Sequence, residues 1–508
     1  MLLHKPSKEN TRAVMLCALY SLILLFFLSP DSYIHDLVGH YDSAWFFTCG
    51  KAWMNGMVPY VDFADSKGPL LWLIYGIGYL LSHHSYVGVF WMSIVFYTAT
   101  LFIAYKLCRL YLETRPAAVA TALVPFFLFY STYRFGMQAE DYCNTFLMLA
   151  LYALCRVLRD WRVLDGRKHF LCAAAMGASC AACVLMKWNI GVGMLVFPAV
   201  ALIYAVRGKK ALHCITGALS GFAVIALPFV VYMLCCGCLD DMVREYFVNT
   251  VATVDDCGDG LSIVNILTGS FVHEKKMFLL LIAGIILFCW KKKWAYLWLI
   301  FCLVALKIVT GASLFRPHYA LVLMPFAIFL VMFVIRLIPR KFLFVKVIIP
   351  IAAVACVFVS YSGELKGNIE QGKRSRQNYY RACYIMAQVE RPTILYYSVD
   401  TGIGTSVGVL PSCRYWAPQT GITDEMKAER DSVLMNRVAD FVVTSTIDEA
   451  EKDRKRVEEA GYVEYETITC FIDFASGKLY GRPGLKLPPD DFYVSDRDVW
   501  LKRNIFGI

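Results

Sequence analysis

The sequence is short of charged residues. Only 18% of its 508 residues are Asp, Glu, Lys or Arg, against about a quarter in an ordinary soluble domain. In contrast, 58% are hydrophobic and the mean hydropathy is +0.53. Long apolar runs fill residues 13–361, whereas residues 362–508 have an ordinary globular composition. The shortage excludes a wholly soluble chain and predicts a membrane region over 1–361 and a water-exposed domain over 362–508.

Several motifs are missing as well. The 19 cysteines form no paired Cys-x-x-Cys pattern of a zinc site, and many lie inside apolar runs, where they behave as small hydrophobic residues. No glycine-rich phosphate loop or nucleophile elbow occurs, and Gly402-x-Gly404 alone is a weak signal. The first apolar run has no cleavage signal, so we expect a retained helix. No cofactor is expected.

Eleven apolar runs are candidate membrane spans. They cover residues 13–29, 88–105, 117–130, 142–158, 170–187, 190–206, 211–235, 277–290, 294–310, 319–335 and 342–361. A twelfth run, Pro69–Ser82, has about 14 residues, which is too short to cross and suits an interfacial or re-entrant helix. The expected fold is a polytopic α-helical membrane protein with about eleven spans and a small C-terminal α/β domain.

The Lys and Arg residues predict the orientation of these spans. If the N-terminus is inside and Pro69–Ser82 does not cross, the inner loops hold about 21 Lys and Arg and the longer outer loops hold about 9, as the positive-inside rule requires. The net charge of +10 is thus explained by the lipid bilayer, and it gives no reason to expect nucleic acid. The long loops 30–68, 131–141, 236–276 and 311–318, and the tail after Tyr361, are expected outside.

The first outer loop has an acid and a lysine at the starts of two short helices. Asp42 opens a stretch with Trp45 and Phe46 at near-helical spacing, which suits a helix lying on the interface. Lys67 stands just before Pro69–Ser82. The two side chains can face a common cleft. Alternatively, Asp42 only caps its helix and Lys67 extends towards lipid phosphates.

A second pair of acids begins the span 142–158. Glu140 and Asp141 follow Arg134 in the next outer loop. Acids also suit a helix N-terminus, so capping is the alternative interpretation. Since neighbouring helical residues point about 100° apart, only one is expected to face a cleft, and we favour Glu140.

The last outer group is Arg316, His318 and Tyr319, on a short loop before the span 319–335. A lone His at a helix start is usually a capping residue, but Arg and His together are typical of an anion site. Lys187, in another short outer turn, is a further candidate cation. Carboxylates beside cations at headgroup depth suit transfer from a lipid-linked phosphate, because a carboxylate can deprotonate an acceptor hydroxyl and cations can stabilise the departing phosphate.

The pattern of the first outer loop resembles the GT-C superfamily of glycosyltransferases. It consists of Asp42, then Gly56-x-x-Pro59-Tyr60, Asp62, Asp65 and Lys67-Gly-Pro-Leu. It is similar in particular to the branch of protein O-mannosyltransferases and lipid A aminoarabinose transferases. The resemblance covers roughly residues 12–361 in layout, with the specific motif in about 25 of them. One departure is Ser43, which follows Asp42 where the branch often has Glu.

This resemblance implies roles for the candidate residues. Asp42 takes the place of the proposed catalytic aspartate. Lys67 takes the place of the lysine that contacts the donor phosphate, and Glu140 or Asp141 takes the place of a second acidic residue in the next outer loop. The segment from Arg316 resembles a stretch that holds the phosphate. The implied reaction is inverting transfer from a polyprenyl-phosphate-linked sugar to a glycan, lipid or protein acceptor, without an obligatory metal. Short connections and basic inner loops fit a bacterial inner membrane, with the site facing the periplasm.

The C-terminal region is predicted to be a small α/β domain with a structural or acceptor-positioning role. Strands are expected at 394–398 and 441–444, and helices at 424–438 and 446–460, the second capped by Thr446. Ser476-Gly477 predicts a hairpin turn.

Two other functions fit a polytopic chain. One is a transporter or flippase of lipid-linked sugars, and the other is a ligase or lipid-linked transferase of different fold. Transporters tend to place ionisable groups near the bilayer midplane. The predicted span centres here are almost free of charge, which favours the glycosyltransferase.

Overall fold

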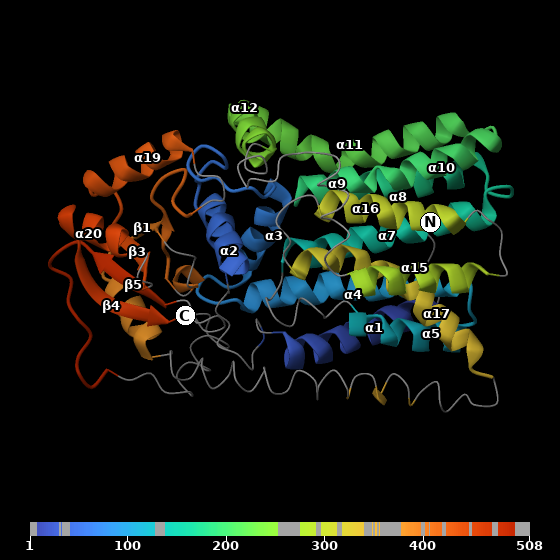
Figure 1. Ribbon diagram of the computed structural model, residues 1–508, viewed down its shortest axis with the longest axis horizontal. Coiled ribbons are helices and arrows are strands. Elements are labelled where there is room, and N and C mark those ends of the chain that lie inside the picture. The colour runs from blue at the N-terminus through green and yellow to red at the C-terminus, as the bar shows by residue number, and fades with distance from the viewer. Residues whose placement is uncertain are drawn as a thin grey trace. The chain divides into compact units, whose positions relative to one another are not determined.

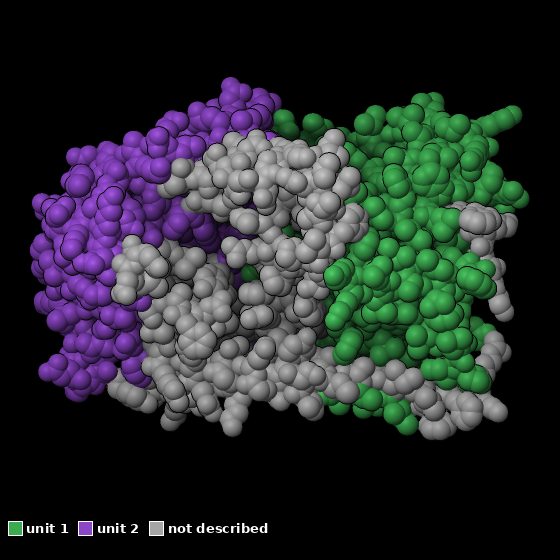
Figure 2. All heavy atoms as spheres, in the orientation of Figure 1, with its two compact units in different colours: residues 1–25, 93–232, 257–360 green, residues 26–92, 233–256, 361–508 purple. Residues whose placement is uncertain are grey.

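A computed structural model describes most of the chain, shown in Figure 1. The described residues are 8–29, 32, 41–127, 138–251, 275–290, 296–311, 317–339, 348, 351–352, 355, 377–397, 402–405, 407–418, 423–446, 450–469 and 476–492. They form two compact units, coloured separately in Figure 2. Unit 1 contains residues 1–25, 93–232 and 257–360, and unit 2 contains residues 26–92, 233–256 and 361–508. The boundary predicted after residue 361 stays a prediction.

Unit 1 is built from long helices that run in a common direction (Figure 1). Three helices have most of their length in it: α1 (Lys8–Leu28), α4 (Val87–Arg109) and α11 (Ala211–Cys235). The others are α5 (Thr114–Leu123), α7 (Ala139–Asp160), α8 (Gly166–Val184), α9 (Trp188–Met194), α10 (Val196–Arg207), α15 (Lys275–Cys289), α16 (Leu297–Gly311), the 3₁₀ helix η3 (Pro317–Phe326) and α17 (Ala327–Leu337). Helix α7 packs on α8, α10 and η3.

Helices α8 and α11 approach closely because glycines face the contact. A Cβ added to Gly177 of α8 would lie 2.0 Å from the Ala218 carbonyl oxygen, and one added to Gly221 of α11 would lie 2.0 Å from the Ala174 carbonyl oxygen. Small residues of this kind let membrane helices pack backbone to backbone. A side chain at either glycine would force the two helices apart.

Unit 2 contains two short apolar helices, further short helical segments and an α/β part. The helices are α2 (Tyr41–Met54), α3 (Pro69–Leu81), α12 (Leu239–Met242), the π-helix η1 (Val243–Val248), the 3₁₀ turn η5 (Ile403–Thr405), α19 (Asp424–Met435) and α20 (Glu451–Glu459). The strands are β1 (Thr393–Tyr396), β2 (Leu410–Pro411), β3 (Phe441–Ser445), β4 (Val463–Thr469) and β5 (Ser476–Gly481). They form one five-stranded sheet in the order β2-β1-β3-β5-β4, in which β1 pairs parallel with β2 and β3, and β5 pairs antiparallel with β3 and β4.

The apolar core of the α/β part explains why its helices lie against the sheet. Leu395 of β1 and Val442 of β3 are buried together with Leu434 of α19 and Val457 of α20. Helix α2 also belongs to this unit by direct contact, because it packs on α3, β2 and η5. Its Lys51 is fully buried and donates hydrogen bonds to the carbonyl oxygens of Gly404 and Val407, the latter at 2.9 Å.

The coarse fold prediction is confirmed. Among the described residues, six helices are long and apolar enough to cross a membrane. They are Lys8–Leu28, Val87–Arg109, Ala139–Asp160, Trp188–Arg207, Ala211–Cys235 and Tyr319–Leu337. Pro69–Leu81 is a shorter apolar helix, as expected for a run that does not cross. The protein is an integral membrane protein with a small sheet, while the count of about eleven spans stays a prediction.

Two details of the C-terminal prediction are wrong. Strand β3 continues to Ser445, and helix α20 begins only at Glu451, after an Ala450 that makes no side-chain cap, so Thr446 is not its cap. The predicted hairpin forms between β4 and β5, but Ser476 and Gly477 pair with Thr469 and Ile468 in its ladder, so they lie in a strand and not in its turn.

Candidate active site

Asp42 lies in the first turn of α2, with its side chain half-buried. The helix is buried on most of its sides, and Gly56, at φ +90°, follows its end. Within the described part of the chain, no hydrogen bond or ion pair engages the Asp42 carboxylate. The capping alternative is therefore not supported by a contact among these residues.

Lys67 comes close to the same helix. Its ammonium nitrogen lies 5.7 Å from the ring centroid of Phe46, one turn after Asp42 on α2. Its nitrogen also donates to Ser66 Oγ at 3.1 Å. Tyr60, in the left-handed region at φ 66°, is buried and donates its hydroxyl to the Lys67 carbonyl oxygen at 3.0 Å. The loop before α3 thus holds Lys67 through its backbone and leaves its ammonium beside α2.

Asp65 is a third charged residue of this group. Its carboxylate accepts hydrogen bonds from Ser66, at 2.6 Å from the backbone N and 3.2 Å from Oγ. Burial raises the pKa of Asp65, the Lys67 charge opposes the rise, and the Asp42 charge adds to it. Asp65 therefore lies within electrostatic reach of both Asp42 and Lys67 in unit 2. Asp65 belongs to the sequence motif of the first outer loop, but no role was predicted for it. Its position two residues before Lys67 could have indicated that it lies near that lysine.

The raised pKa of Asp65 predicts that the difference in stability between wild type and Asp65→Asn depends on pH. A carboxyl whose pKa is higher in the folded protein than its ordinary 3.8 favours folding below that value, and this contribution is lost as the pH rises through the folded pKa. We expect the melting temperature of Asp65→Asn, relative to wild type, to increase between about pH 4 and pH 7. Thermal unfolding of the detergent-purified protein across that range measures this. A constant difference would show that Asp65 keeps its ordinary pKa.

Glu140 and Asp141 have different surroundings at the start of α7 in unit 1. Asp141 Oδ2 accepts a hydrogen bond from the Gln138 backbone N at 2.8 Å, in a capping box. Glu140 forms an ion pair with Lys187, and both side chains are largely buried, with 3% and 13% exposed. The Lys187 ammonium lies 3.7 Å from the ring centroid of Tyr319. Asp141 thus takes part in the cap of α7, whereas Glu140 pairs with Lys187 at the start of α9.

The buried Glu140–Lys187 pair predicts a large effect on stability. Lys187→Met leaves a buried carboxylate without its cation, which typically costs about 3–5 kcal/mol. We therefore expect a clear loss in melting temperature, most of it recovered when Glu140→Gln is added. Lys168→Met is the matched control, because its pair with Asp165 is half exposed and contributes little. Equal stability of Lys187→Met and Lys168→Met would contradict this interpretation.

Three predicted residues are not placed. Arg134 and Arg316 lie outside the described residues, as does the side chain of His318. Of the residues that are placed, Asp42 and Lys67 both lie within electrostatic reach of Asp65 in unit 2, and Glu140 lies with Lys187 and Tyr319 in unit 1. Over the described ranges, no group of three or more His, Cys, Asp or Glu side chains could hold a metal ion.

Comparison with known proteins supports the predicted resemblance. Residues 66–212 match the model of the dolichyl-phosphate-mannose-protein mannosyltransferase family, which is less than half of the chain. No curated protein matches the sequence. The fold is similar to that of ArnT from Cupriavidus metallidurans bound to undecaprenyl phosphate, with a TM-score of 0.59 and 13% identity over 94% of this chain and 99% of ArnT. For ArnT from Cupriavidus metallidurans in the apo state, the TM-score is 0.57 and the identity is 12%, over 92% of this chain and 97% of ArnT. The chain thus has an ArnT-like fold, and the predicted resemblance to the GT-C superfamily is confirmed.

Proposed function

We propose that this protein is a membrane glycosyltransferase that moves a sugar from a polyprenyl-phosphate donor to an acceptor hydroxyl, with inversion at the anomeric carbon. The observation that supports the proposal is the charged group in unit 2, where Asp65 lies within electrostatic reach of both the half-buried Asp42 and Lys67, and the Lys67 ammonium lies beside α2. The ArnT-like fold and the mannosyltransferase match over 66–212 agree with it. By the same likeness, the donor lipid is undecaprenyl phosphate or a related polyprenyl phosphate.

Asp42 and Lys67 divide the chemistry between them. Asp42 takes the proton from the acceptor hydroxyl as its oxygen attacks the anomeric carbon. The bond from that carbon to the phosphate oxygen breaks, and its electron pair stays on the phosphate. Lys67 stabilises the negative charge on the departing polyprenyl phosphate. The products are a glycosylated acceptor, a polyprenyl phosphate and the proton held by Asp42.

The other predicted residues keep supporting roles in the proposal. Glu140 is the second acidic residue of the site, and Lys187 and Tyr319 bind the donor phosphate. Arg134, Arg316 and His318 are further donor-phosphate residues. Asp141 caps α7 and is the weaker candidate of the two acids for chemistry. We place the reaction on the outer face of a bacterial inner membrane, following the positive-inside orientation.

Comparison of envelope glycans tests this function in the cell. Cells carrying the wild-type chain and cells carrying Asp42→Asn are compared by mass spectrometry of glycolipids, polysaccharides and glycoproteins. We expect one sugar to be missing from one class in the variant, which would also identify the acceptor. Unchanged glycans in all three classes, with both proteins present in equal amounts, would refute the proposal.

A further inference from the structure

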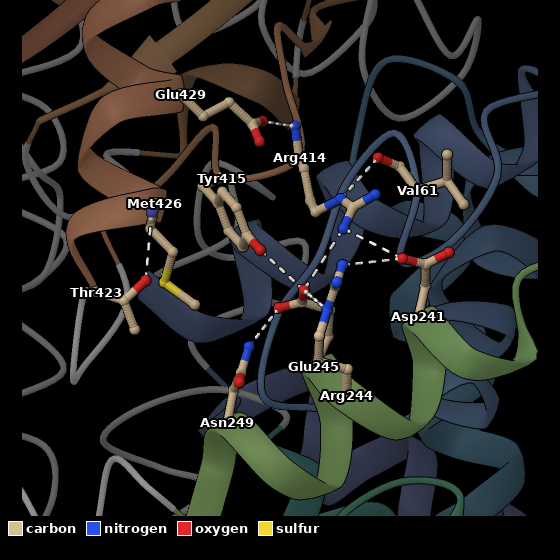
Figure 3. A network of polar contacts seen from close by, with 10 residues as sticks. All are labelled: Val61, Asp241, Arg244, Glu245, Asn249, Arg414, Tyr415, Thr423, Met426 and Glu429. Atoms are coloured by element: carbon tan, nitrogen blue, oxygen red, sulfur yellow. Dashed lines mark hydrogen bonds and ion pairs between the residues drawn. The ribbon is translucent and has the colours of Figure 1, made fainter.

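Arg414 of the C-terminal region is bonded directly to the loop that carries Asp65 and Lys67. Its Nε donates to the Val61 carbonyl oxygen at 3.1 Å, and its own carbonyl oxygen accepts from the Ala64 N–H at 2.9 Å. Figure 3 shows the guanidinium group reaching Val61 from the segment beside α19. Two bonds to one loop from a residue about 350 positions away fix that loop against the α/β part.

The same guanidinium group is held in place from its other side. Its Nη1 lies 3.2 Å from Asp241 Oδ1 and 3.6 Å from Glu245 Oε1 (Figure 3). The Arg414 backbone N–H donates to Glu429 Oε1 of α19 at 2.9 Å. A planar guanidinium with donors in several directions can contact Val61, Asp241 and Glu245 at once, whereas an ammonium group cannot reproduce that geometry. Arg414 thus connects the loop with α12, η1 and α19.

Glu245 is the buried centre of this group, with 2% of its side chain exposed. It accepts from the Tyr415 hydroxyl at 2.8 Å and from Asn249 Nδ2 at 2.9 Å, and it pairs with Arg244 at 3.3 Å. It lies in the π-helix η1, a form of helix that is rare and often occurs at functional sites. A buried carboxylate with this many partners holds a single arrangement.

Aromatic packing continues the connection to Lys67. Tyr246, next to Glu245, has its ring centroid 6.3 Å from that of Tyr60, whose hydroxyl holds the Lys67 carbonyl. Tyr60 also packs on Trp72 of α3, at 4.8 Å between centroids. Ala64 is buried with Tyr415 and Met426. Arg414 and Tyr415 therefore contact the loop 60–67 at Val61 and Ala64, and Tyr60 connects its start to the Lys67 carbonyl oxygen.

We propose that Arg414 and Tyr415 are positioning residues for the donor phosphate: the C-terminal region fixes the loop 60–67 and thereby places the Lys67 ammonium. This inference rests on the proposed function, in which Lys67 binds the phosphate. It gives the C-terminal region a role on the donor side, beyond the structural or acceptor-positioning role expected from the sequence. Neither residue touches the donor itself, so the effect passes through Lys67.

The test measures the affinity of the full-length protein in detergent for undecaprenyl phosphate. We expect Arg414→Met to raise the Kd by about tenfold to a hundredfold, since small displacements of a binding group have effects of that size. Tyr415→Phe, which removes only the bond to Glu245, should raise it less. In a Lys67→Ala background, Arg414→Met should have no further effect, because the group it positions is already absent.

Matched variants separate the possible outcomes. Arg381→Met removes another ion pair of the C-terminal region, with Glu466 at 2.8 Å, that has no contact with the loop, and it should leave the Kd unchanged. Wild-type affinity in both Arg414→Met and Tyr415→Phe would overturn the inference alone. An equal further loss in the Lys67→Ala background would also overturn it. Failure of the wild-type protein to bind undecaprenyl phosphate would instead refute the proposed function.

Discussion

Asp42→Asn is expected to lower the rate of sugar transfer by about 10²–10⁴-fold, the usual contribution of a general base. Asparagine has nearly the same shape as aspartate, so α2 should fold as before, but an amide cannot accept the proton of the acceptor hydroxyl. The measurement is turnover under donor saturation with purified protein. Because Asp42 acts on the acceptor, affinity for undecaprenyl phosphate should change little.

Asp62→Asn is the matched control for this experiment. Asp62 belongs to the same loop motif, but its carboxylate accepts a hydrogen bond from the Val58 N–H at 2.6 Å in a turn. An asparagine oxygen can accept that bond as well, so transfer should stay close to wild type. If Asp42→Asn keeps near-wild-type turnover while Asp62→Asn does too, Asp42 is not the base.

Lys67→Ala is expected to weaken undecaprenyl phosphate binding by about tenfold to a hundredfold, since a hydrogen bond to a charged group typically contributes about 1.5–3 kcal/mol. The protein should remain folded, because the Tyr60 hydroxyl holds this loop through the Lys67 carbonyl oxygen, which alanine also has. The affinity can be measured by thermal shift of the detergent-solubilised protein as lipid is added.

Undecaprenol, which lacks the phosphate, is the matched ligand for Lys67. Wild type and Lys67→Ala should bind this alcohol equally weakly, and Lys67→Arg should recover part of the phosphate affinity. If Lys67→Ala binds undecaprenyl phosphate as tightly as wild type, another residue supplies the positive charge.

The local parts of the fold could be predicted from the sequence. Helix α11 occupies the predicted residues 211–235, and the short apolar run from Pro69 forms α3. Both follow from hydropathy and from Pro at a helix start, which are properties of neighbouring residues. The alternative roles of Glu140 and Asp141 were also recognisable, but only the contacts assign the cap to Asp141 and the ion pair to Glu140.

Contacts between distant segments could not be predicted. Arg414 and Val61 are about 350 residues apart, and neither lies in a motif that identifies the other. Glu245 lies in η1, within the segment 236–276 that was predicted to be an outer loop, and its burial depends on partners such as Tyr415, 170 positions away. Charge and periodicity describe one segment at a time, so these contacts could be found only in the structure.

Reconstituted transfer is the most direct test of the central claim that Asp42 and Lys67 catalyse transfer from a polyprenyl-phosphate sugar. Purified protein in liposomes is given an undecaprenyl-phosphate-linked sugar and the acceptor class identified from the envelope glycans. We predict that wild type releases undecaprenyl phosphate as it glycosylates the acceptor, and that Asp42→Asn does neither at a comparable rate. Movement of the intact lipid-linked sugar across the bilayer, with no undecaprenyl phosphate released, would contradict the account and identify a transporter.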